Sequence, residues 1–364
     1  MNNTFGMCKK SIVVFVKNLT SGGAEKQSVL LAKVLAAHHK VYYVILNAKF
    51  QEPRYLALLQ EVPAITVKAF EGNLISRFIQ FCRYLRQRQP QAVFSYLTAA
   101  NFFAVMAAKL AGVRNVYTGI RSAYLPPAKA MIDRWLCNQW AKKAVLNCYS
   151  GQTYFLSRGF DPQKMIVIPN CFELIRPYRD KVRSAAPIRI ISVGRFVAEK
   201  DYDTALAVIR ELSLVYPGIK YQIIGHGALE ADVRGRIAVL NLQDVVEVFI
   251  NPGNIAALLD KADIYLSTSV FEGTSNAIME ALNADLPVVA TNVGDNYKLV
   301  HPDENGFLTN VKDITGLVSC LERLVLDQQL RAEMGRKGKQ LLADHYSTTR
   351  FSENYRLLME GGGL

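Results

Sequence analysis

The sequence predicts an α/β protein built from two facing, Rossmann-like, doubly wound domains with a cleft between them. Three observations lead to this fold class. Short runs of β-branched residues alternate with longer amphipathic segments. The alternation starts again after a break that is marked by prolines, and 364 residues suit two domains of ordinary size.

The first series of elements precedes the break. Strands that alternate with helices indicate βαβ units and therefore a parallel sheet. We expect strands at 12–16, 41–46, 64–67, 92–96, 115–118, 144–148 and 165–168, and helices near 22–37, 74–88, 99–111, 129–142 and 150–158.

The second series repeats this rhythm. We expect strands at 188–193, 220–224, 245–250, 264–267, 287–291 and 306–308, and helices near 201–215, 227–240, 254–261, 275–284, 312–326 and 328–343. The prolines of the break favour a domain at 1–172, a linker at 173–187 and a domain at 188–346. One further helical pattern starts at Ser347 and covers about 347–360.

The charge of the chain is divided unevenly between its halves. The net charge is +12, of which residues 1–180 contribute +16 and the remaining residues −4. A basic half indicates an anionic partner, such as a phosphorylated substrate or a membrane surface. Because the basic half has no recognition motif for nucleic acid, we expect no nucleic-acid partner.

Several classes of protein are excluded by pattern. The six cysteines are scattered without a C-x-x-C pair, which favours reduced core thiols in a cytoplasmic protein. No cluster of metal-ligand residues is present, and no run approaches 18 apolar residues. The apolar run 12–16 is too short for the core of a signal peptide. We therefore expect no metal and no membrane-spanning helix.

The stretch 271–282 carries the most informative chemistry. Gly273, Thr274 and Ser275 follow an expected strand and open a helix, whose free N–H groups would bind an anion. Glu272 stands before this helix and Glu280 inside it, so two carboxylates bracket its N-terminus at about the span of a diphosphate. The alternative interpretation is that Glu272 caps a turn and Glu280 is a solvated helix residue.

A second stretch, 192–203, follows the first strand of the second domain. Gly194 allows the chain to turn, and Arg195 and Lys200 would project into the crevice where doubly wound folds bind ligands. These two cations suit a diphosphate, although a solvated pair in a loop remains the alternative. Asp201 and Asp203 resemble a metal-binding pair, but capping of the next helix is the favoured interpretation.

Glycines mark two other junctions between strand and helix. Gly22 and Gly23 would allow a ligand to approach the backbone of the first domain, and Gly225 would do so in the second. Neither junction matches the G-x-G-x-x-G fingerprint, so the signal depends on its position alone.

Two basic amphipathic segments, 74–88 and 129–143, lie in the first domain. Both could rest on an anionic membrane with their cations on phosphates. The alternative is that each apolar face packs on the domain's own sheet and the cations face solvent.

These residues together resemble glycosyltransferase family 4, whose members are retaining enzymes that use nucleotide sugars. The segment from Glu272 to Glu280 looks like the E-x7-E motif of the family, and Gly194-Arg195 with Lys200 looks like its G-R…E-K motif. The resemblance covers about 12–309 and implies the GT-B architecture, with the acceptor bound by the N-terminal domain and the donor by the C-terminal one. It also implies that the final helix packs back on the first domain.

The resemblance also implies roles for individual residues. Arg195 and Lys200 would hold the diphosphate, Glu280 the ribose and Glu272 the donor sugar. Backbone N–H groups from Thr274 to Asn276 would assist with phosphate. Many relatives carry a histidine in the first domain near the transferred sugar, and Arg121 occupies the corresponding position here.

We therefore expect a retaining, metal-independent hexosyltransferase. It would move a sugar from a nucleotide sugar, a UDP-sugar by preference, to a glycan acceptor on a polyprenyl-phosphate carrier, in the assembly of cell-surface polysaccharide. The basic domain suggests peripheral contact with the inner face of the cytoplasmic membrane. The alternatives are a nucleotide-sugar epimerase on the same fold and a non-catalytic protein that binds nucleotide sugars.

Overall fold

The computed structural model describes residues 10–179 and 187–362, which form two compact units. The first unit consists of the chain up to Glu173 and the segment from Thr348 onward, and the second extends from Leu174 to Ser347. The linker expected at 173–187 lies partly outside the described residues. Of its described part, 174–179 is attached to the second unit, where the Arg176 guanidinium forms two hydrogen bonds of 2.7 and 2.6 Å to the carboxylate of Asp260.

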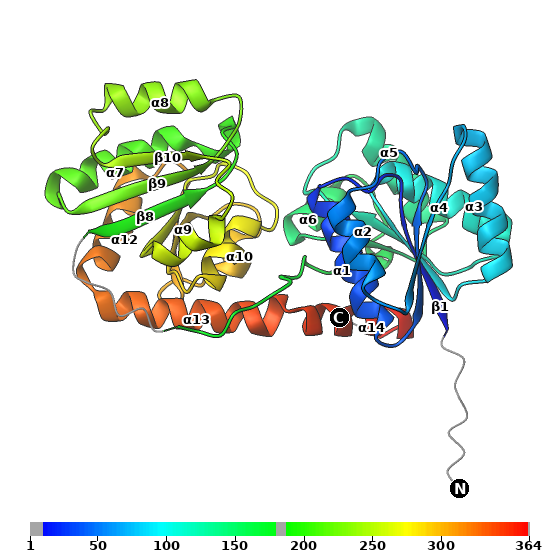
Figure 1. Ribbon diagram of the computed structural model, residues 1–364. Coiled ribbons are helices and arrows are strands. Elements are labelled where there is room, and N and C mark those ends of the chain that lie inside the picture. Colours follow the sequence, from blue (N-terminus) through cyan, green and yellow to red (C-terminus); the bar gives the residue numbers. More distant parts are fainter. Residues whose placement is uncertain (1–9, 180–186, 363–364) are drawn as a thin grey trace, which may run out of the picture. The chain divides into compact units, whose positions relative to one another are not determined.

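The first unit contains a parallel sheet of seven strands in the order β3-β2-β1-β4-β5-β6-β7. Helices lie on both sides of this sheet (Figure 1). Its strands are β1 (Ser11–Val16), β2 (Lys40–Ile45), β3 (Ile65–Ala69), β4 (Ala92–Tyr96), β5 (Val116–Ile120), β6 (Lys143–Leu146) and β7 (Met165–Val167). Its helices are α1 (Gly23–Ala36), α2 (Pro53–Gln60), α3 (Leu74–Arg88), α4 (Thr98–Ala111), α5 (Pro127–Gln139), α6 (Tyr149–Ser157), η1 (Pro162–Lys164) and α14 (Thr348–Glu360).

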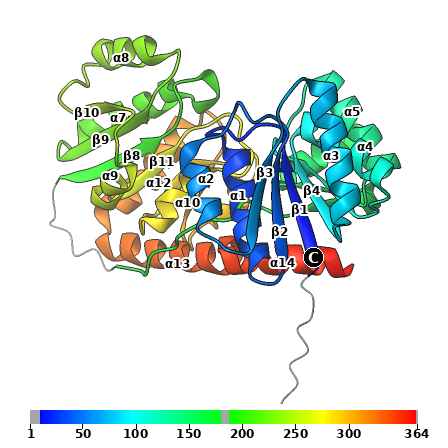
Figure 2. The same cartoon turned by 45° about the vertical axis from the view of Figure 1, so that its right-hand side comes forward.

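Alternate residues of β1 feed two separate hydrophobic cores. Val14 and its neighbours on the same side pack with apolar residues of α1, α2 and α14, whereas Val13 and Phe15 pack with α3, α4 and α5. This division follows because successive side chains of a strand point to opposite faces of the sheet. The sheet is therefore covered on both faces, and α14 lies beside α1 on one of them (Figure 2).

The second unit contains a parallel sheet of six strands in the order β10-β9-β8-β11-β12-β13. Its strands are β8 (Ile188–Val193), β9 (Ile219–Gly225), β10 (Val246–Ile250), β11 (Ile264–Ser267), β12 (Val288–Thr291) and β13 (Gly306–Thr309). Its helices are η2 (Ala198–Lys200), α7 (Tyr202–Val215), α8 (Glu230–Val239), α9 (Ile255–Lys261), α10 (Asn276–Asn283), α11 (Asn296–Leu299), α12 (Ile314–Leu326) and α13 (Gln328–Tyr346).

Two short helices were missed by the sequence prediction. The helix α2 has eight residues and buries Tyr55 and Leu59, which is too little periodic signal to recognise. The helix α11 is a single turn of four residues. The short 3₁₀ turns η1 and η2 were not expected either. The other elements agree with expectation to within a few residues, as when β5 extends to Ile120 rather than ending at 118. Among the described residues, none of the helices has the length and apolarity needed to cross a bilayer.

Candidate active site

The site predicted from the two motifs lies at the carboxyl edge of the second sheet, where the C-terminal ends of its strands meet. Gly194 and Arg195 follow β8, the segment 268–275 follows β11, and Gly225 ends β9. The strand order changes direction between β8 and β11, because β9 lies on the other side of β8. Open α/β sheets bind ligands outside the strand ends at such a point.

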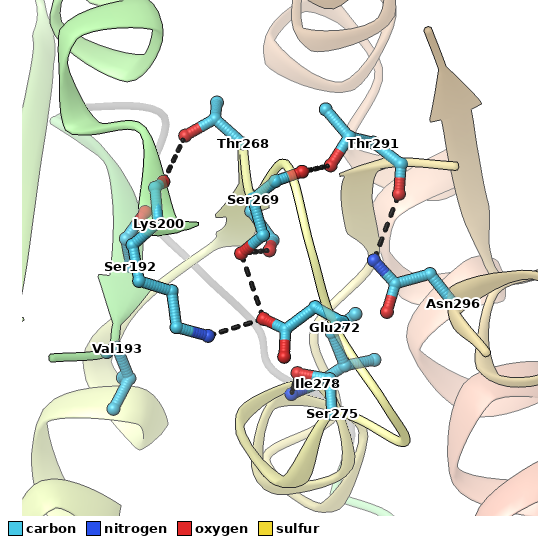
Figure 3. Close-up of polar contacts among 12 residues, drawn as sticks. Ser192, Val193, Lys200, Thr268, Ser269, Glu272, Ser275, Ile278, Thr291 and Asn296 are labelled. Carbon is cyan, nitrogen blue, oxygen red and sulfur yellow. Dashed lines mark hydrogen bonds and ion pairs between the residues drawn. The ribbon is translucent and has the colours of Figure 1, made fainter. Parts of the chain in front are cut away.

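Lys200 and Glu272, from the two separate motifs, form an ion pair at this edge (Figure 3). Ser269 Oγ donates to the same carboxylate oxygen, Glu272 Oε1, at 2.9 Å. The side chains of the lysine and the glutamate are only 21% and 13% exposed, so their charges are poorly screened by water. The structure thus assembles one cation and one carboxylate into a single polar cluster.

Backbone contacts hold the two loops that carry this pair. Thr268 Oγ1 lies 3.1 Å from the carbonyl oxygen of Lys200 and 2.9 Å from that of Asp201, and it donates to them. Asp201 also caps α7, since its carboxylate accepts from the backbone N–H of Thr204 at 3.4 Å and from the Thr204 hydroxyl at 2.7 Å. The capping interpretation of Asp201 is therefore confirmed.

Gly194 and Gly225 lie in direct backbone contact. A Cβ added to Gly225 would come within 1.9 Å of the Gly194 carbonyl oxygen, and that same oxygen accepts from the hydroxyl of Tyr202 at 3.0 Å. A Cβ on Gly194 would meet the Lys200 side chain at 3.1 Å. Both glycines therefore allow the Lys200 loop to lie close against the ends of β8 and β9.

The N-terminus of α10 opens at the same edge. Ser275 is the N-cap, and its hydroxyl accepts from the backbone N–H of Ile278 at 3.4 Å. The preceding turn is fixed by Thr274 Oγ1, which donates to the buried carboxylate of Asp295 at 3.0 Å, and by the Asp295 N–H, which donates to the Gly273 carbonyl at 3.2 Å. First-turn N–H groups without intrahelical acceptors give this end a partial positive charge.

Glu280 lies in the second turn of α10, is partly buried, and has polar interactions of its own. It and Glu272 both lie near the buried phenol of Tyr265, whose hydroxyl donates to the Val193 carbonyl at 3.3 Å. Burial raises the pKa of Tyr265 well above its ordinary value, and the nearby negative charges raise that pKa further. The two glutamates therefore share one neighbourhood above β11.

Arg195 follows β8 and its side chain is exposed at this edge. Among the described residues its guanidinium has no hydrogen bond or ion pair. Because Lys200 already has Glu272 as its anionic partner, Arg195 and the N-terminus of α10 supply positive charge that is open to an incoming anion.

Several residues of the site were missed by sequence reasoning. Ser269 and Thr268 hold the Lys200 loop, and Asp295 holds the loop before α10. Thr291 and Asn296 continue this network: the Thr291 hydroxyl donates to the Ser269 carbonyl, and Asn296 Nδ2 donates to the Thr291 carbonyl at 2.9 Å (Figure 3). The sequence offered one signal for these residues, which is that they lie at or shortly after the ends of β11 and β12. Residues at the carboxyl ends of parallel strands gather at one edge of the sheet.

In the first unit, Gly22 and Gly23 begin α1 directly after the loop that follows β1. Gly22 is the N-cap, and a Cβ there would come within 2.4 Å of Glu25 Oε2, whereas a Cβ on Gly23 would meet nothing within 4 Å. Thr20 Oγ1 donates to Glu25 Oε1 at 3.1 Å across this turn. The space beside Gly23 is thus open, and the approach of a ligand to its backbone stays a prediction.

Arg121 follows β5 at the carboxyl edge of the first sheet, where it contacts two tyrosines. Its Nη2 donates to the hydroxyl of Tyr355 on α14 at 3.0 Å, and its guanidinium carbon lies 4.4 Å from the ring centroid of Tyr96. The other guanidinium nitrogens, Nε and Nη1, are buried without a hydrogen-bond partner among the described residues. Arg121 therefore fastens α14 to the sheet and retains unused donors.

Within the described residues, no group of three or more His, Cys, Asp or Glu residues is arranged to hold a metal ion.

The two parallel sheets match the GT-B class of glycosyltransferases. The solved structure of Anabaena Alr3699/HepE in complex with UDP superposes with a TM-score of 0.81 at 17% identity, covering 96% of this chain and 100% of that one. Residues 21–176 match the model for Glycosyltransferase Family 4, and residues 177–341 match the model for Glycosyl transferases group 1. The chain therefore belongs to the family 4 type of glycosyltransferases.

Two curated relatives have named activities. An N-acetylgalactosamine-N,N'-diacetylbacillosaminyl-diphospho-undecaprenol 4-alpha-N-acetylgalactosaminyltransferase of Campylobacter jejuni is 25% identical over 350 residues, which cover 90% of this chain and 93% of the relative. A UDP-Gal:alpha-D-GlcNAc-diphosphoundecaprenol alpha-1,3-galactosyltransferase of Escherichia coli is 24% identical over 274 residues, 69% of this chain and 70% of the relative. Both relatives act on sugars that are linked to a lipid diphosphate.

Proposed function

We propose that this glycosyltransferase transfers a hexose from a UDP-sugar to a sugar on a polyprenyl-diphosphate carrier, with retention of anomeric configuration and without a metal ion. The observation that carries the proposal is the joint placement of Arg195, Lys200, Glu272 and the N-terminus of α10 at one sheet edge. Support for the donor comes from the UDP named with the Anabaena structure and with the Escherichia coli relative. Support for the acceptor and the alpha linkage comes from the names of both curated relatives.

Positive charge at this edge suits the leaving group of the reaction. In transfer, the bond between the sugar C1 and the UDP β-phosphate oxygen breaks, and C1 bonds to the acceptor hydroxyl oxygen, whose proton passes to the departing phosphate. Arg195, Lys200 and the first-turn N–H groups of α10 would stabilise the charge that develops on the diphosphate. These groups can serve that purpose without a metal ion.

The carboxylates would orient the two sugars of the donor. Glu272 would accept from hydroxyls of the transferred sugar, and Glu280 from the ribose. Gly194 and Gly225 would let the backbone approach the diphosphate. The turn from Gly273 through Asn276 at the start of α10 would do the same, and the side chain of Asn276 is exposed.

The first unit would bind the acceptor. Gly22 and Gly23 open a helix N-terminus at its carboxyl edge, and Arg121 has two buried nitrogens there without a hydrogen-bond partner in the described part of the chain. We propose that these three residues contact the substrates from the first unit. The excess of positive charge in residues 1–180 also supports peripheral contact with an anionic membrane, and cytoplasmic action at its inner face.

The test is transfer from a panel of UDP-sugars to a polyprenyl-diphosphate-linked sugar, in EDTA, with the product anomer read by NMR. We expect an alpha product and full activity in EDTA. An inverted product or activity that needs a divalent cation would contradict the proposal. Arg195→Ala should lower kcat/KM about 100-fold or more, because a charge-stabilising group is lost, whereas Arg210→Ala on the exposed part of α7 should change nothing.

Two further outcomes would identify another function. Epimerisation of the donor incubated alone would indicate a nucleotide-sugar epimerase. Binding of UDP-sugar without turnover on any acceptor would indicate a non-catalytic binding protein.

A further inference from the structure

An apolar groove lies on the first unit between α3 and α4. Its volume is about 530 Å³, and it is lined by Leu74, Ile75, Phe78, Phe102, Phe103, Met106, Lys109 and Leu110. Ile75 is 72% exposed and Leu110 is 58% exposed, which is unusual for large apolar side chains that lie together. The phenyl rings of Phe78 and Phe103 form its floor, with their centroids 5.9 Å apart. A contiguous apolar surface of this kind indicates a binding face.

The exposed charges on the helices around the groove have one sign. The helix α3 carries four arginines and no carboxylate, and α4 carries Lys109 and no carboxylate. The neighbouring helix α5 carries Asp133, but this carboxylate is buried and accepts from Thr98 Oγ1 at 2.6 Å and from Asn101 Nδ2 at 2.9 Å. The exposed charges of all three helices are therefore positive.

Aromatic side chains border the same face. The ammonium of Lys109 lies 3.2 Å from the centroid of the Trp140 ring, just after α5, and Trp140 packs edge-on against Trp135 at 6.2 Å. The two indoles are 40% and 45% exposed. Exposed tryptophans beside cations are typical of surfaces that lie at the boundary between lipid headgroups and acyl chains.

We propose that this face, formed by the α3–α4 groove and its basic rim, docks on an anionic phospholipid bilayer. Ile75, Leu110 and the groove lining would enter the boundary of the acyl chains, and Arg83, Lys109 and their basic neighbours would meet lipid phosphates. A second copy of the chain fits less well, because a twofold contact would bring two faces of the same positive sign together.

One end of this face lies beside the edge at which a membrane-borne acceptor would bind. Leu74 and Ile75 begin α3 at the carboxyl edge of the first sheet, the edge at which α/β folds bind ligands. The inference rests on the proposed function and deepens it, because it names the surface that meets the membrane holding the acceptor. It differs from the sequence expectation, in which the separate segments 74–88 and 129–143 contact the membrane and α4 takes no part.

The experiment measures flotation of the full chain with vesicles of phosphatidylcholine alone or mixed with phosphatidylglycerol. We expect binding to the anionic vesicles, and a drop of at least about tenfold in the double variant Ile75→Ser with Leu110→Ser, whose charge is unchanged. The matched control is Leu214→Ser with Val239→Ser, since these side chains are 74% and 70% exposed on the second unit. Arg83→Glu should also weaken binding, and Arg210→Glu should not.

Tryptophan fluorescence gives an independent readout. The chain contains two tryptophans, Trp135 and Trp140, and both border this face. Anionic vesicles should shift their emission to shorter wavelength in the native chain and in the control variant, but not in the Ile75→Ser, Leu110→Ser variant. Unchanged circular dichroism and Tm in that variant establish that it folds.

Activity assays separate this inference from the proposed function. The groove variant should lose transfer to an acceptor in vesicles and keep transfer to a short-chain, water-soluble acceptor. Vesicle binding without transfer to either acceptor would overturn the proposed function and leave the docking face standing. Equal vesicle binding by the groove variant and the native chain would overturn the docking face. So would groove-dependent dimerisation, or groove-dependent binding of a detergent-dispersed polyprenyl phosphate, without affinity for vesicles.

Discussion

Lys200 and Glu272 are 72 residues apart in the chain and form an ion pair at the carboxyl edge of the second sheet. Their two motifs lie on the loops after β8 and β11, which are neighbouring strands. In the proposed function Lys200 also binds the diphosphate, so we expect substitutions of Lys200 and Glu272 to be energetically coupled.

This coupling makes the effects of two substitutions non-additive. We expect Lys200→Ala and Glu272→Ala each to lower kcat/KM about 100-fold or more, because each removes part of one charge-stabilising cluster. The double variant should be little worse than either single variant, since each substitution already disrupts the other residue. Steady-state kinetics of all four proteins provide the measurement. The exposed pair Arg234–Glu230 on α8 is the control, and its removal should leave kcat/KM unchanged. Multiplicative losses would show that Lys200 and Glu272 act separately.

The backbone contact between Gly194 and Gly225 predicts the effect of one added methyl group. Gly225→Ala should lower the free energy of unfolding by at least about 2 kcal/mol, because its Cβ would lie 1.9 Å from the Gly194 carbonyl oxygen. Donor binding should weaken as well, since the displaced loop carries Arg195. Urea unfolding and UDP titration are the measurements.

Gly235→Ala on α8 is the matched control. Nothing lies within 4 Å of the added Cβ, so this helix-interior substitution should stabilise the protein by about 0.5–1 kcal/mol. If the two variants were equally stable, the close packing of β8 and β9 would have no energetic consequence.

The hydrogen bond from Arg121 to Tyr355 predicts how firmly α14 is held. Tyr355→Phe should preserve the ring contacts with Phe94 and Phe351 and remove the hydroxyl that accepts from the guanidinium. We expect a loss of about 2 kcal/mol in the free energy of unfolding, because the donor is charged and buried. Arg350→Ala, which breaks an exposed ion pair on the same helix, should cost at most about 0.5 kcal/mol.

A comparison of Tyr355→Phe with Arg121→Lys tests the catalytic prediction for Arg121. If this arginine only fastens α14, Arg121→Lys and Tyr355→Phe should change kcat/KM equally little. A selective loss of kcat in Arg121→Lys would support its predicted catalytic part.

Buried thiols predict a loss of stability in alkali. Burial raises the pKa of Cys137 and of Cys171 from 9.0 to about 12. The unfolded chain therefore releases these protons at a lower pH than the folded protein, and their contribution to stability is complete below pH 9 and is lost as the pH rises towards 12. The free energy of unfolding should fall between pH 9 and 10, where these thiols ionise in the unfolded chain and its tyrosines begin to do so.

Cys137→Ala measures the contribution of one of these thiols between pH 9 and 10, because it removes that thiol. The slope of unfolding free energy against pH should become shallower by up to about 1.4 kcal/mol per pH unit, the limit for one proton. Any packing loss from the substitution is independent of pH and shifts the whole curve. An unchanged slope from urea unfolding at several pH values would show that Cys137 does not titrate as its burial implies.

Much of the fold could be predicted because its signals are local. Strand runs such as 12–16 and 188–193 are nearly continuous in apolar residues, as expected for parallel strands buried on both faces. The helix α2 could not be predicted, because it buries only two of its eight residues and its position depends on packing beside β3.

The candidate site was predicted in the same partial way. Glycines and charges next to strand ends located Gly194, Arg195 and Glu272, because the carboxyl ends of parallel strands share one edge. Ser269 and Asp295 could not be recognised, since short polar residues are common in loops and these two gain their importance from partners across the edge.

The sequence by itself determined the α/β class, the two successive series of alternating strands and helices, the residues of both motifs and the basic character of the first half. These are properties of composition and of periodicity along the chain. The tertiary structure alone decided that Lys200 pairs with Glu272, that Arg121 holds Tyr355, and that α3 and α4 leave a groove between them. Each of these depends on which strands and helices become neighbours, and contacts between residues far apart in sequence leave no periodic trace in one chain.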